Sequence, residues 1–245
     1  MTNSSAPLQA TSVEPVNAVV PPALLQFDPR QVPFVAGPEG LPAVPPAQLT
    51  AQALRTRFAT PPAWTPELRH EPRMTDRIPA QAAVLVPIVM REQPTVLLTE
   101  RSSHLKNHSG QVAFPGGRVD PEDANIAAAA LREAWEEVGL SAQYIEVLGS
   151  LPTYTTVTSF IVTPVVALVR PDFELTINPH EVAEAFEVPF GFLMNPANHR
   201  RHSLVDDEQM SREWLSMPYQ DGPHERYVWG ATAGMLRNLY RFLSA

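Results

Sequence analysis

Two stretches of this chain are the most informative about its fold: Ser109-Gly110-Gln111-Val112-Ala113-Phe114-Pro115-Gly116-Gly117-Arg118 and Arg132-Glu133-Ala134-Trp135-Glu136-Glu137-Val138-Gly139-Leu140. A Gly-Gly pair leads into a segment with three glutamates within five residues. If residues 124–138 form a helix, Glu133 and Glu137 stand one turn apart and Glu136 projects from the same side. Apolar residues follow helical spacing on the other side and are expected to anchor the helix to a sheet: Ala127, Leu131, Ala134 and Val138.

Three carboxylates this close together repel one another unless a cation balances their charge. Hard oxygen ligands suit Mg²⁺ or Mn²⁺, which also keep several waters and take phosphate oxygens. Arg132 lies four residues before Glu136 and is placed to orient its carboxylate. A glutamate-rich helix is more often a solvated, salt-bridged face, but the Gly-Gly turn ahead of it and Gly139 behind it favour a metal site. The predicted ligands are Glu133, Glu136 and Glu137, with the Gly116 carbonyl as an additional candidate.

The segment that begins at Gly117 resembles the Nudix box, written G-x5-E-x7-R-E-u-x-E-E-x-G-u, where u is a bulky aliphatic residue. This chain reads G-x5-D-x8-R-E-A-W-E-E-V-G-L. It departs from the box in three places: Asp123 replaces Glu, one extra residue precedes Arg132, and Ala134 replaces the aliphatic residue. The catalytic half of the box is intact. The resemblance implies an α/β fold, the Nudix α/β/α sandwich with a mixed β-sheet.

A second motif points to one branch of that family. Residues 97–117 resemble the signature L-L-T-x-R-S-x-x-L-x-x-H-x-G-x-V-x-F-P-G-G of the coenzyme A pyrophosphatase branch, and every fixed position is met. The resemblance implies metal-dependent hydrolysis of the diphosphate bond of coenzyme A, or of its acyl or oxidised derivatives, to 3′,5′-ADP and 4′-phosphopantetheine species. The alternative is a Nudix enzyme acting on ADP-ribose, NADH or a nucleoside triphosphate. A catalytically silent, nucleotide-binding Nudix domain is disfavoured because the box glutamates are present.

Site residues follow from the two motifs. Catalysis is assigned to Arg132, Glu133, Glu136, Glu137 and Glu181, with the general base left open between the box glutamates and the later pair Glu181 and Glu184. Substrate binding is assigned to Arg101, Lys106, His108, Gly116 and Gly117. Arginine grips phosphate with two parallel hydrogen bonds, and coenzyme A carries a 3′-phosphate besides its diphosphate. A structural role for His108 in fixing the loop is the alternative.

The composition limits the other classes of function. There are no cysteines, so disulfides and thiolate metal ligands are excluded and a reducing cytoplasm is expected. No apolar run approaches the ~18 residues of a membrane span. A net charge of −8 gives no general attraction to nucleic acid. The expected partner is therefore a small nucleotide-like substrate, with a homodimer left open.

Ten of the 27 prolines lie in the first 50 residues, so residues 1–79 are predicted to be a proline-rich extension and linker, partly irregular. Residues 80–245 are predicted to form the Nudix domain. Strands are expected at 82–90, 95–99, 144–151 and 160–169, with Pro164 marking an edge or bulge. Asp123 is the expected N-cap of the catalytic helix, 181–186 a short turn or helix, 199–202 a basic turn, and 229–243 a closing helix.

Overall fold

The computed structural model describes residues 28–37, 40–71, 78–102, 110–205 and 211–245. The larger of its two sheets contains β2 (Ala80–Val89), β3 (Thr95–Arg101), β4 (Val112–Ala113), β5 (Gly116–Arg118), β6 (Ile145–Ser150), β7 (Tyr154–Thr155), β8 (Phe160–Val169) and β9 (Val182–Pro189). The smaller sheet has the order β1 (Phe34–Ala36), β10 (Arg200–Val205), β11 (Ser211–Asp221) and β12 (His224–Trp229). The α-helices are α1 (Ala51–Ala59), α2 (Ile126–Val138), α3 (Phe190–Leu193) and α4 (Gly230–Leu243), with short 3-10 turns at Pro46–Leu49, Ala142–Tyr144 and Pro196–Asn198.

The centre of the larger sheet is the parallel pair β2 and β8, in register from Ala80 opposite Phe160 to Val89 opposite Val169. All other strand pairs in this sheet are antiparallel, so the sheet is mixed. β2 and β8 are nearly continuous runs of apolar residues because both of their faces are covered, which is usual for parallel strands inside a sandwich.

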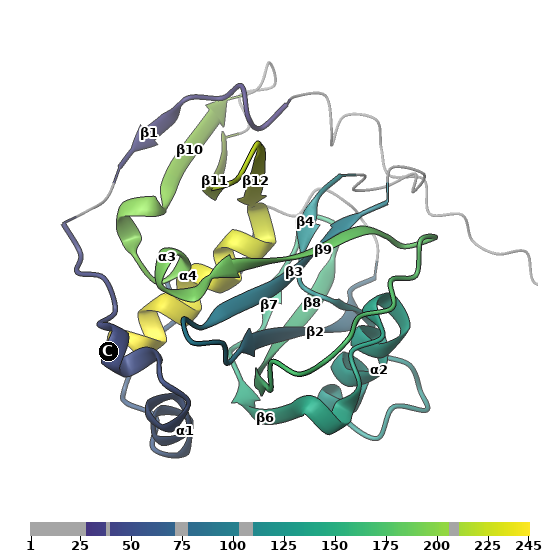
Figure 1. Cartoon of the computed structure of the whole chain (residues 1–245). Helices are drawn as coiled ribbons and strands as arrows, with labels where there is room; N and C mark the ends of the chain where they lie inside the picture. The colour runs from purple at the N-terminus through teal and green to yellow at the C-terminus, as the bar shows by residue number, and fades with distance from the viewer. Residues whose placement is uncertain (1–27, 38–39, 72–77, 103–109, 206–210) are drawn as a thin grey trace, which may run out of the picture.

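Helices cover the two faces of this sheet (Figure 1). On one face, α2 packs its alanines and Val138 against a cluster that includes Ala83, Leu85 and Val165. On the other face, α4 packs Leu236 and Tyr240 into the larger cluster. The expected α/β/α sandwich with a mixed sheet is confirmed. Within the described ranges, no helix has the length and apolarity needed to cross a membrane.

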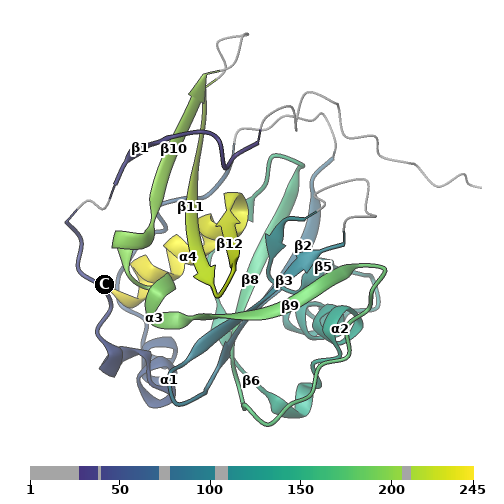
Figure 2. The ribbon, with the colours of Figure 1, turned by 45° about the horizontal axis from the view of Figure 1, so that its top comes forward.

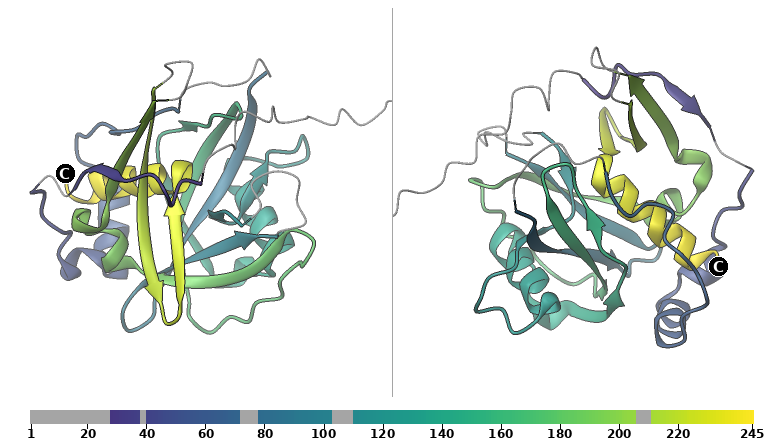
Figure 3. Two further views of the ribbon diagram at one scale, coloured as in Figure 1. Left: turned by 90° about the horizontal axis from the view of Figure 1, so that it is seen from above. Right: turned by 180° about the vertical axis from the view of Figure 1, so that it is seen from behind.

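The smaller sheet was not predicted, and it changes the surroundings of α4. Figures 2 and 3 show α4 between the larger sheet and β10–β12. Leu215, Met217 and Val228 of the smaller sheet belong to the same apolar cluster as α4. Eleven of the 14 residues of α4 are buried, as expected for a helix that is covered on opposite sides.

Part of the proline-rich segment packs into this core. Val44, Leu49 and Leu54 are buried in the cluster around α4. The carbonyl of Pro42 accepts a hydrogen bond of 2.9 Å from the Tyr240 hydroxyl. β1 adds an antiparallel edge strand to β10. The described part of residues 28–71 therefore contributes to the fold, while the division at residue 79 stays a prediction.

The structure corrects three local predictions, which concern a helix cap, residues 181–186 and Pro164. Asn125, not Asp123, caps α2, because the Asn125 side chain accepts from the Ala128 amide at 2.9 Å. Residues 182–186 belong to strand β9, since they pair with β3, and not to a turn or helix. Pro164 lies in β8, a central strand of the larger sheet. Beside it the neighbouring chain passes from β6 to β7, so the missing N–H of the proline costs no hydrogen bond between strands.

Residues 199–202 were expected to form a solvated basic turn, and this prediction is wrong. His199 and His202 are buried, and β10 begins at Arg200. The Nε2 atom of His199 lies 2.8 Å from the Leu193 carbonyl, and His202 stacks on Trp214. Burial lowers the pKa of His199 to about 4, so its ring is neutral near pH 7. These histidines are core residues and not contacts for an anion.

Arg226 of β12 joins the two sheets. Its guanidinium makes two hydrogen bonds of 2.7 Å to the Glu184 carboxylate on β9 and one of 3.1 Å to Asp221. It also lies over the Phe186 ring, 4.2 Å from the ring centroid. Because the guanidinium is buried, its charge is compensated by these partners and by the Glu100 carboxylate of β3, 3.6 Å away.

Replacing this arginine tests the sheet junction. Arg226→Met should lower the free energy of unfolding by about 2 kcal/mol, because several charge-assisted hydrogen bonds are lost at a buried position. Urea denaturation measures the change. The control Arg55→Met removes an exposed ion pair to Glu146 and should leave stability close to wild type. Equal stabilities for the two variants would contradict this role of Arg226.

Candidate functional site

The Gly-Gly turn lies directly against helix α2, which contacts strand β5. A Cβ atom on Gly117 would lie 2.6 Å from both carboxylate oxygens of Glu133, and one on Gly116 would lie 2.4 Å from the Ala83 carbonyl oxygen. The Gly116 amide donates a hydrogen bond of 3.1 Å to Glu137. A side chain at position 116 would displace the backbone of strand β2, and one at position 117 would push the Glu133 carboxylate out of its place.

Arg132 organises acidic groups on helix α2 and in the loop before it. Its guanidinium makes a two-point contact with Asp123 at 2.9 and 3.0 Å. The same group donates to Glu133 at 3.0 Å and to Glu136 at 3.2 Å. These hydrogen bonds lower the pKa of Asp123 and raise that of Arg132. Asp123, which departs from the usual Glu of the box, thus serves as the main partner of Arg132.

Glu137 is the most deeply buried of the three glutamates. Burial raises the pKa of its carboxyl group to about 7, and the Glu133 and Glu181 carboxylates act in the same direction. The Gly116 amide and the Arg101 guanidinium, 4.0 Å away, oppose the rise. Burial also raises the pKa of Glu133, although Arg132 counteracts it. Excess negative charge is therefore concentrated where α2 meets the turn.

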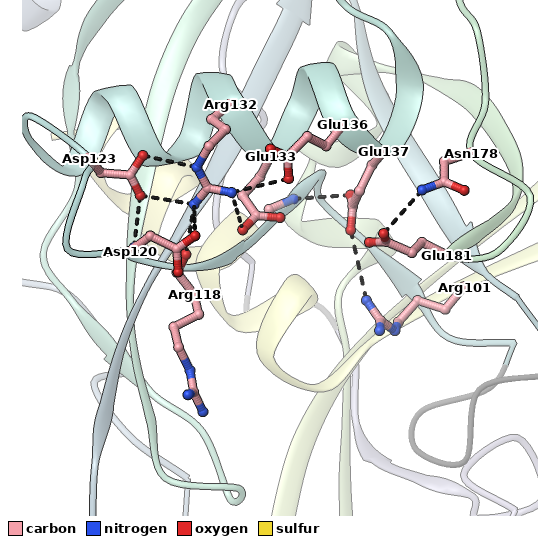
Figure 4. A network of polar contacts seen from close by, with 11 residues as sticks. Arg101, Arg118, Asp120, Asp123, Arg132, Glu133, Glu136, Glu137, Asn178 and Glu181 are labelled. Carbon is pink, nitrogen blue, oxygen red and sulfur yellow. Dashed lines mark hydrogen bonds and ion pairs between the residues drawn. The ribbon is translucent and has the colours of Figure 1, made fainter. Parts of the chain in front are cut away.

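Two later glutamates that were candidates for the general base lie in different surroundings. Glu181, immediately before β9, accepts a hydrogen bond of 3.1 Å from Asn178 and faces Glu137 (Figure 4). The carbonyl of Glu181 also accepts from the Ser102 amide, which fixes it beside the end of β3. Glu184 is paired with Arg226 and is thereby held at the sheet junction. Of the two, Glu181 is the one near the box glutamates.

The donor set fits a hard divalent cation better than any other metal. Glu133, Glu136 and Glu137 offer oxygen atoms alone, and two of them have raised pKa values that a nearby cation would reverse. Across the described ranges, no three acidic or histidine side chains are placed as a ready-made metal cluster. Arg132 instead draws Glu133 and Glu136 towards itself, which keeps the three negative charges apart.

The structure thus brings Arg101, Gly116, Gly117, Arg132, Glu133, Glu136, Glu137 and Glu181 into one region. Lys106 and His108, which were also expected to bind substrate, lie outside the described residues. The sequence did not point to Asn178, which donates a hydrogen bond to Glu181. It predicted Asp123 as a helix cap, whereas Asp123 pairs with Arg132. The pairing of Asp123 with Arg132, nine residues later, could not be predicted from helical spacing, because Asp123 lies in the loop before the helix.

Comparisons with known proteins identify the family of this chain. The family model for the NUDIX domain matches residues 79–209. A protein of Enterobacter sp. (strain 638), named "Uncharacterized Nudix hydrolase NudL", is 46% identical over 159 residues, which is 65% of this chain and 80% of the relative. Its counterpart from Shigella flexneri is 45% identical over 175 residues, covering 71% and 86% of the two chains. The chain therefore belongs to the Nudix hydrolases.

Solved structures with a similar arrangement are more distant. A Caenorhabditis elegans Ap4A hydrolase binary complex is 21% identical, with a TM-score of 0.39, and the match covers 45% of this chain and 80% of that chain. The Nudix hydrolase RenU of Mycobacterium smegmatis is 24% identical, with a TM-score of 0.38 and coverage of 46% and 71%.

The buried carboxyl group of Glu137 makes stability depend on pH. Because its folded-state pKa is raised from 4.5 to about 7, the folded protein binds the proton more tightly than the unfolded chain does. Stability without metal should therefore fall as the pH rises from about 4.5 to 7, by a few kcal/mol at about 1.4 kcal/mol per pKa unit. Glu137→Gln removes this effect but keeps an acceptor for the Gly116 amide.

Thermal unfolding in EDTA at pH 5 and pH 8 measures this difference. The melting temperature of Glu137→Gln minus that of wild type should be more positive at pH 8 than at pH 5. The control Glu122→Gln changes an exposed loop carboxylate and should show no such trend. The same difference at both pH values would contradict the raised pKa.

Proposed function

We propose that this Nudix hydrolase cleaves the diphosphate bond of coenzyme A, or of its acyl or oxidised derivatives, with the help of Mg²⁺ or Mn²⁺. One observation supports the proposal above all others. The Nε atom of Arg101 is buried and has no hydrogen-bond acceptor within the described residues. It lies in the segment 97–117 that resembles the coenzyme A pyrophosphatase signature, beside the Glu137 carboxylate. The Arg101 side chain is 33% exposed, so its guanidinium can pair with a phosphate oxygen of the substrate.

The chain's own groups then have distinct tasks. Glu133, Glu136 and Glu137 would hold the cation, and Arg132 would orient the first two of them. A bound cation neutralises diphosphate oxygens and lowers the pKa of water. Arg101 would bind a phosphate oxygen next to the cation site. Glu181, close to Glu137 and held by Asn178, is our candidate for the base that accepts the proton of the attacking water.

The alternative is a Nudix enzyme that uses ADP-ribose, NADH or a nucleoside triphosphate. The box residues would act on any of these substrates, because each contains a diphosphate linkage. The segment 97–117 favours coenzyme A. Assaying the purified protein with coenzyme A, acetyl-coenzyme A, NADH and ADP-ribose, each with Mg²⁺ and with Mn²⁺, separates the candidates. The highest kcat/KM on a substrate other than a coenzyme A derivative would refute the proposed specificity.

Glu136→Gln tests the cation site. The substitution removes a metal ligand and, with it, stabilisation of the transition-state charge. It should therefore lower kcat by about 10³-fold or more. The protein should stay folded by circular dichroism, because this side chain is half exposed and its carboxylate is paired with Arg132. Steady-state kinetics at saturating Mg²⁺ and Mn²⁺ gives the result, with Glu122→Gln as the matched control. Near-wild-type turnover would remove Glu136 from the site.

Arg101→Ala tests phosphate binding. Loss of one charge-assisted contact should cost about 1.5–3 kcal/mol, or roughly a 10- to 150-fold loss of kcat/KM. Since Arg101 lies beside Glu137, the loss should be the same for coenzyme A and for dephospho-coenzyme A, which lacks the 3′-phosphate. Arg170→Ala, at an exposed position, is the control. A defect confined to coenzyme A would place Arg101 at the 3′-phosphate instead.

A further inference from the structure

A cavity of about 560 Å³ opens beside β7, and none of its lining residues belongs to α2. Its polar lining residues are Arg69, His70, Glu71, Thr153 and Thr155, and Pro66 and Pro152 complete the lining. Its volume is within the range of small-molecule sites, about 300–1,000 Å³. None of the motifs described above includes a residue of this cavity.

The walls of the cavity are held in place by hydrogen bonds. Residues 69–71 extend the sheet beside β7, because the Thr155 amide donates to the Arg69 carbonyl at 2.9 Å and the Glu71 amide donates to the Thr155 carbonyl at 2.8 Å. The Glu71 carboxylate accepts from the Val157 amide at 2.9 Å and from the Tyr154 hydroxyl at 3.3 Å. These hydrogen bonds within the chain fix the positions of the cavity walls.

The cavity presents donors suited to an anion. The Arg69 guanidinium has no carboxylate partner within the described part of the chain, whereas Arg132, Arg226 and Arg237 are each paired. The one carboxylate at the cavity, that of Glu71, is engaged with Val157 and Tyr154. A guanidinium, an imidazole and two hydroxyl groups are the side chains that commonly bind phosphate. They gather here although the whole chain has a net charge of −8.

The cavity lies at the same end of the larger sheet as the Gly-Gly turn. Gly117 of β5 is opposite Ala83 of β2, Ala83 is opposite Thr163 of β8, and the neighbouring Val162 is opposite Tyr154 of β7. Three strand spacings of roughly 4.8 Å separate β5 from β7, or about 14 Å. A substrate that extends beyond its diphosphate could therefore reach both places.

We propose that this cavity is an anion subsite for a phosphomonoester group carried by the substrate at a distance from the scissile diphosphate. The assignment rests on the proposed function, in which the substrate carries such a group at its 3′ position. It gives Arg69 a task separate from that of Arg101. Arg101 contacts the diphosphate beside the cation site, and Arg69 selects substrates that carry the additional phosphate.

Binding without catalysis tests the subsite directly. Isothermal titration calorimetry in EDTA compares 3′,5′-ADP, 5′-AMP and inorganic phosphate on wild type, Arg69→Ala and Arg200→Ala. Arg69→Ala should weaken 3′,5′-ADP about tenfold or more and leave 5′-AMP unchanged. Arg200→Ala removes an equal charge from the smaller sheet, where Arg200 lies over Phe34, and should bind all three probes as wild type does. Unchanged binding of 3′,5′-ADP and phosphate by Arg69→Ala would overturn the subsite.

Kinetics separates the sources of the phosphate. For coenzyme A, Arg69→Ala should raise KM about tenfold with kcat unchanged, and for dephospho-coenzyme A it should change neither constant. Weaker binding of inorganic phosphate with an unchanged KM for coenzyme A would overturn the substrate assignment in favour of a free phosphate ion. If wild type hydrolyses neither compound, the proposed function fails, while the calorimetric comparison still decides whether the anion subsite exists.

Discussion

The concentration of carboxylates between the Gly-Gly turn and helix α2 is the constraint on which the site depends. A side chain at position 117 would displace the Glu133 carboxylate, and the Gly116 amide is hydrogen-bonded to Glu137. Burial raises the pKa of both carboxyl groups, and the neighbouring carboxylates act in the same direction. Arg132 offsets part of this effect by bonding to Asp123, Glu133 and Glu136, which leaves Glu137 with the least compensation.

The rest of the fold holds this arrangement rigid. The parallel pair β2 and β8 anchors the turn through β5 on one side and carries β7 on the other. Helix α4 is buried between the two sheets, and Arg226 bonds the smaller sheet to β9, the strand that follows Glu181. The position of Glu181 opposite α2 therefore depends on the same strand that joins the two sheets.

Much of the fold and the site could be predicted from the sequence because local pattern specifies them. The apolar runs of β2 and β8, the spacing of the glutamates and the Gly-Gly pair are local features, and the corresponding elements are present. The smaller sheet escaped prediction because β10–β12 alternate irregularly and gain their core against α4, which is distant in the sequence. Residues 182–186 were assigned to a turn or helix for the same reason, since their strand partners are on β3.

The sequence by itself determined the Nudix family, the three glutamates and the residue types at the turn. These depend on spacing within one helix and on the absence of side chains at two positions, so they are readable without coordinates. The tertiary structure decided which charged groups meet. It paired Arg132 with Asp123, buried Glu137, set Glu181 beside it and held Glu184 at the sheet junction. It also gathered Arg69, His70, Thr153 and Thr155 around one cavity. Contacts of this kind join segments far apart in the chain, and a single sequence does not specify which of them come together.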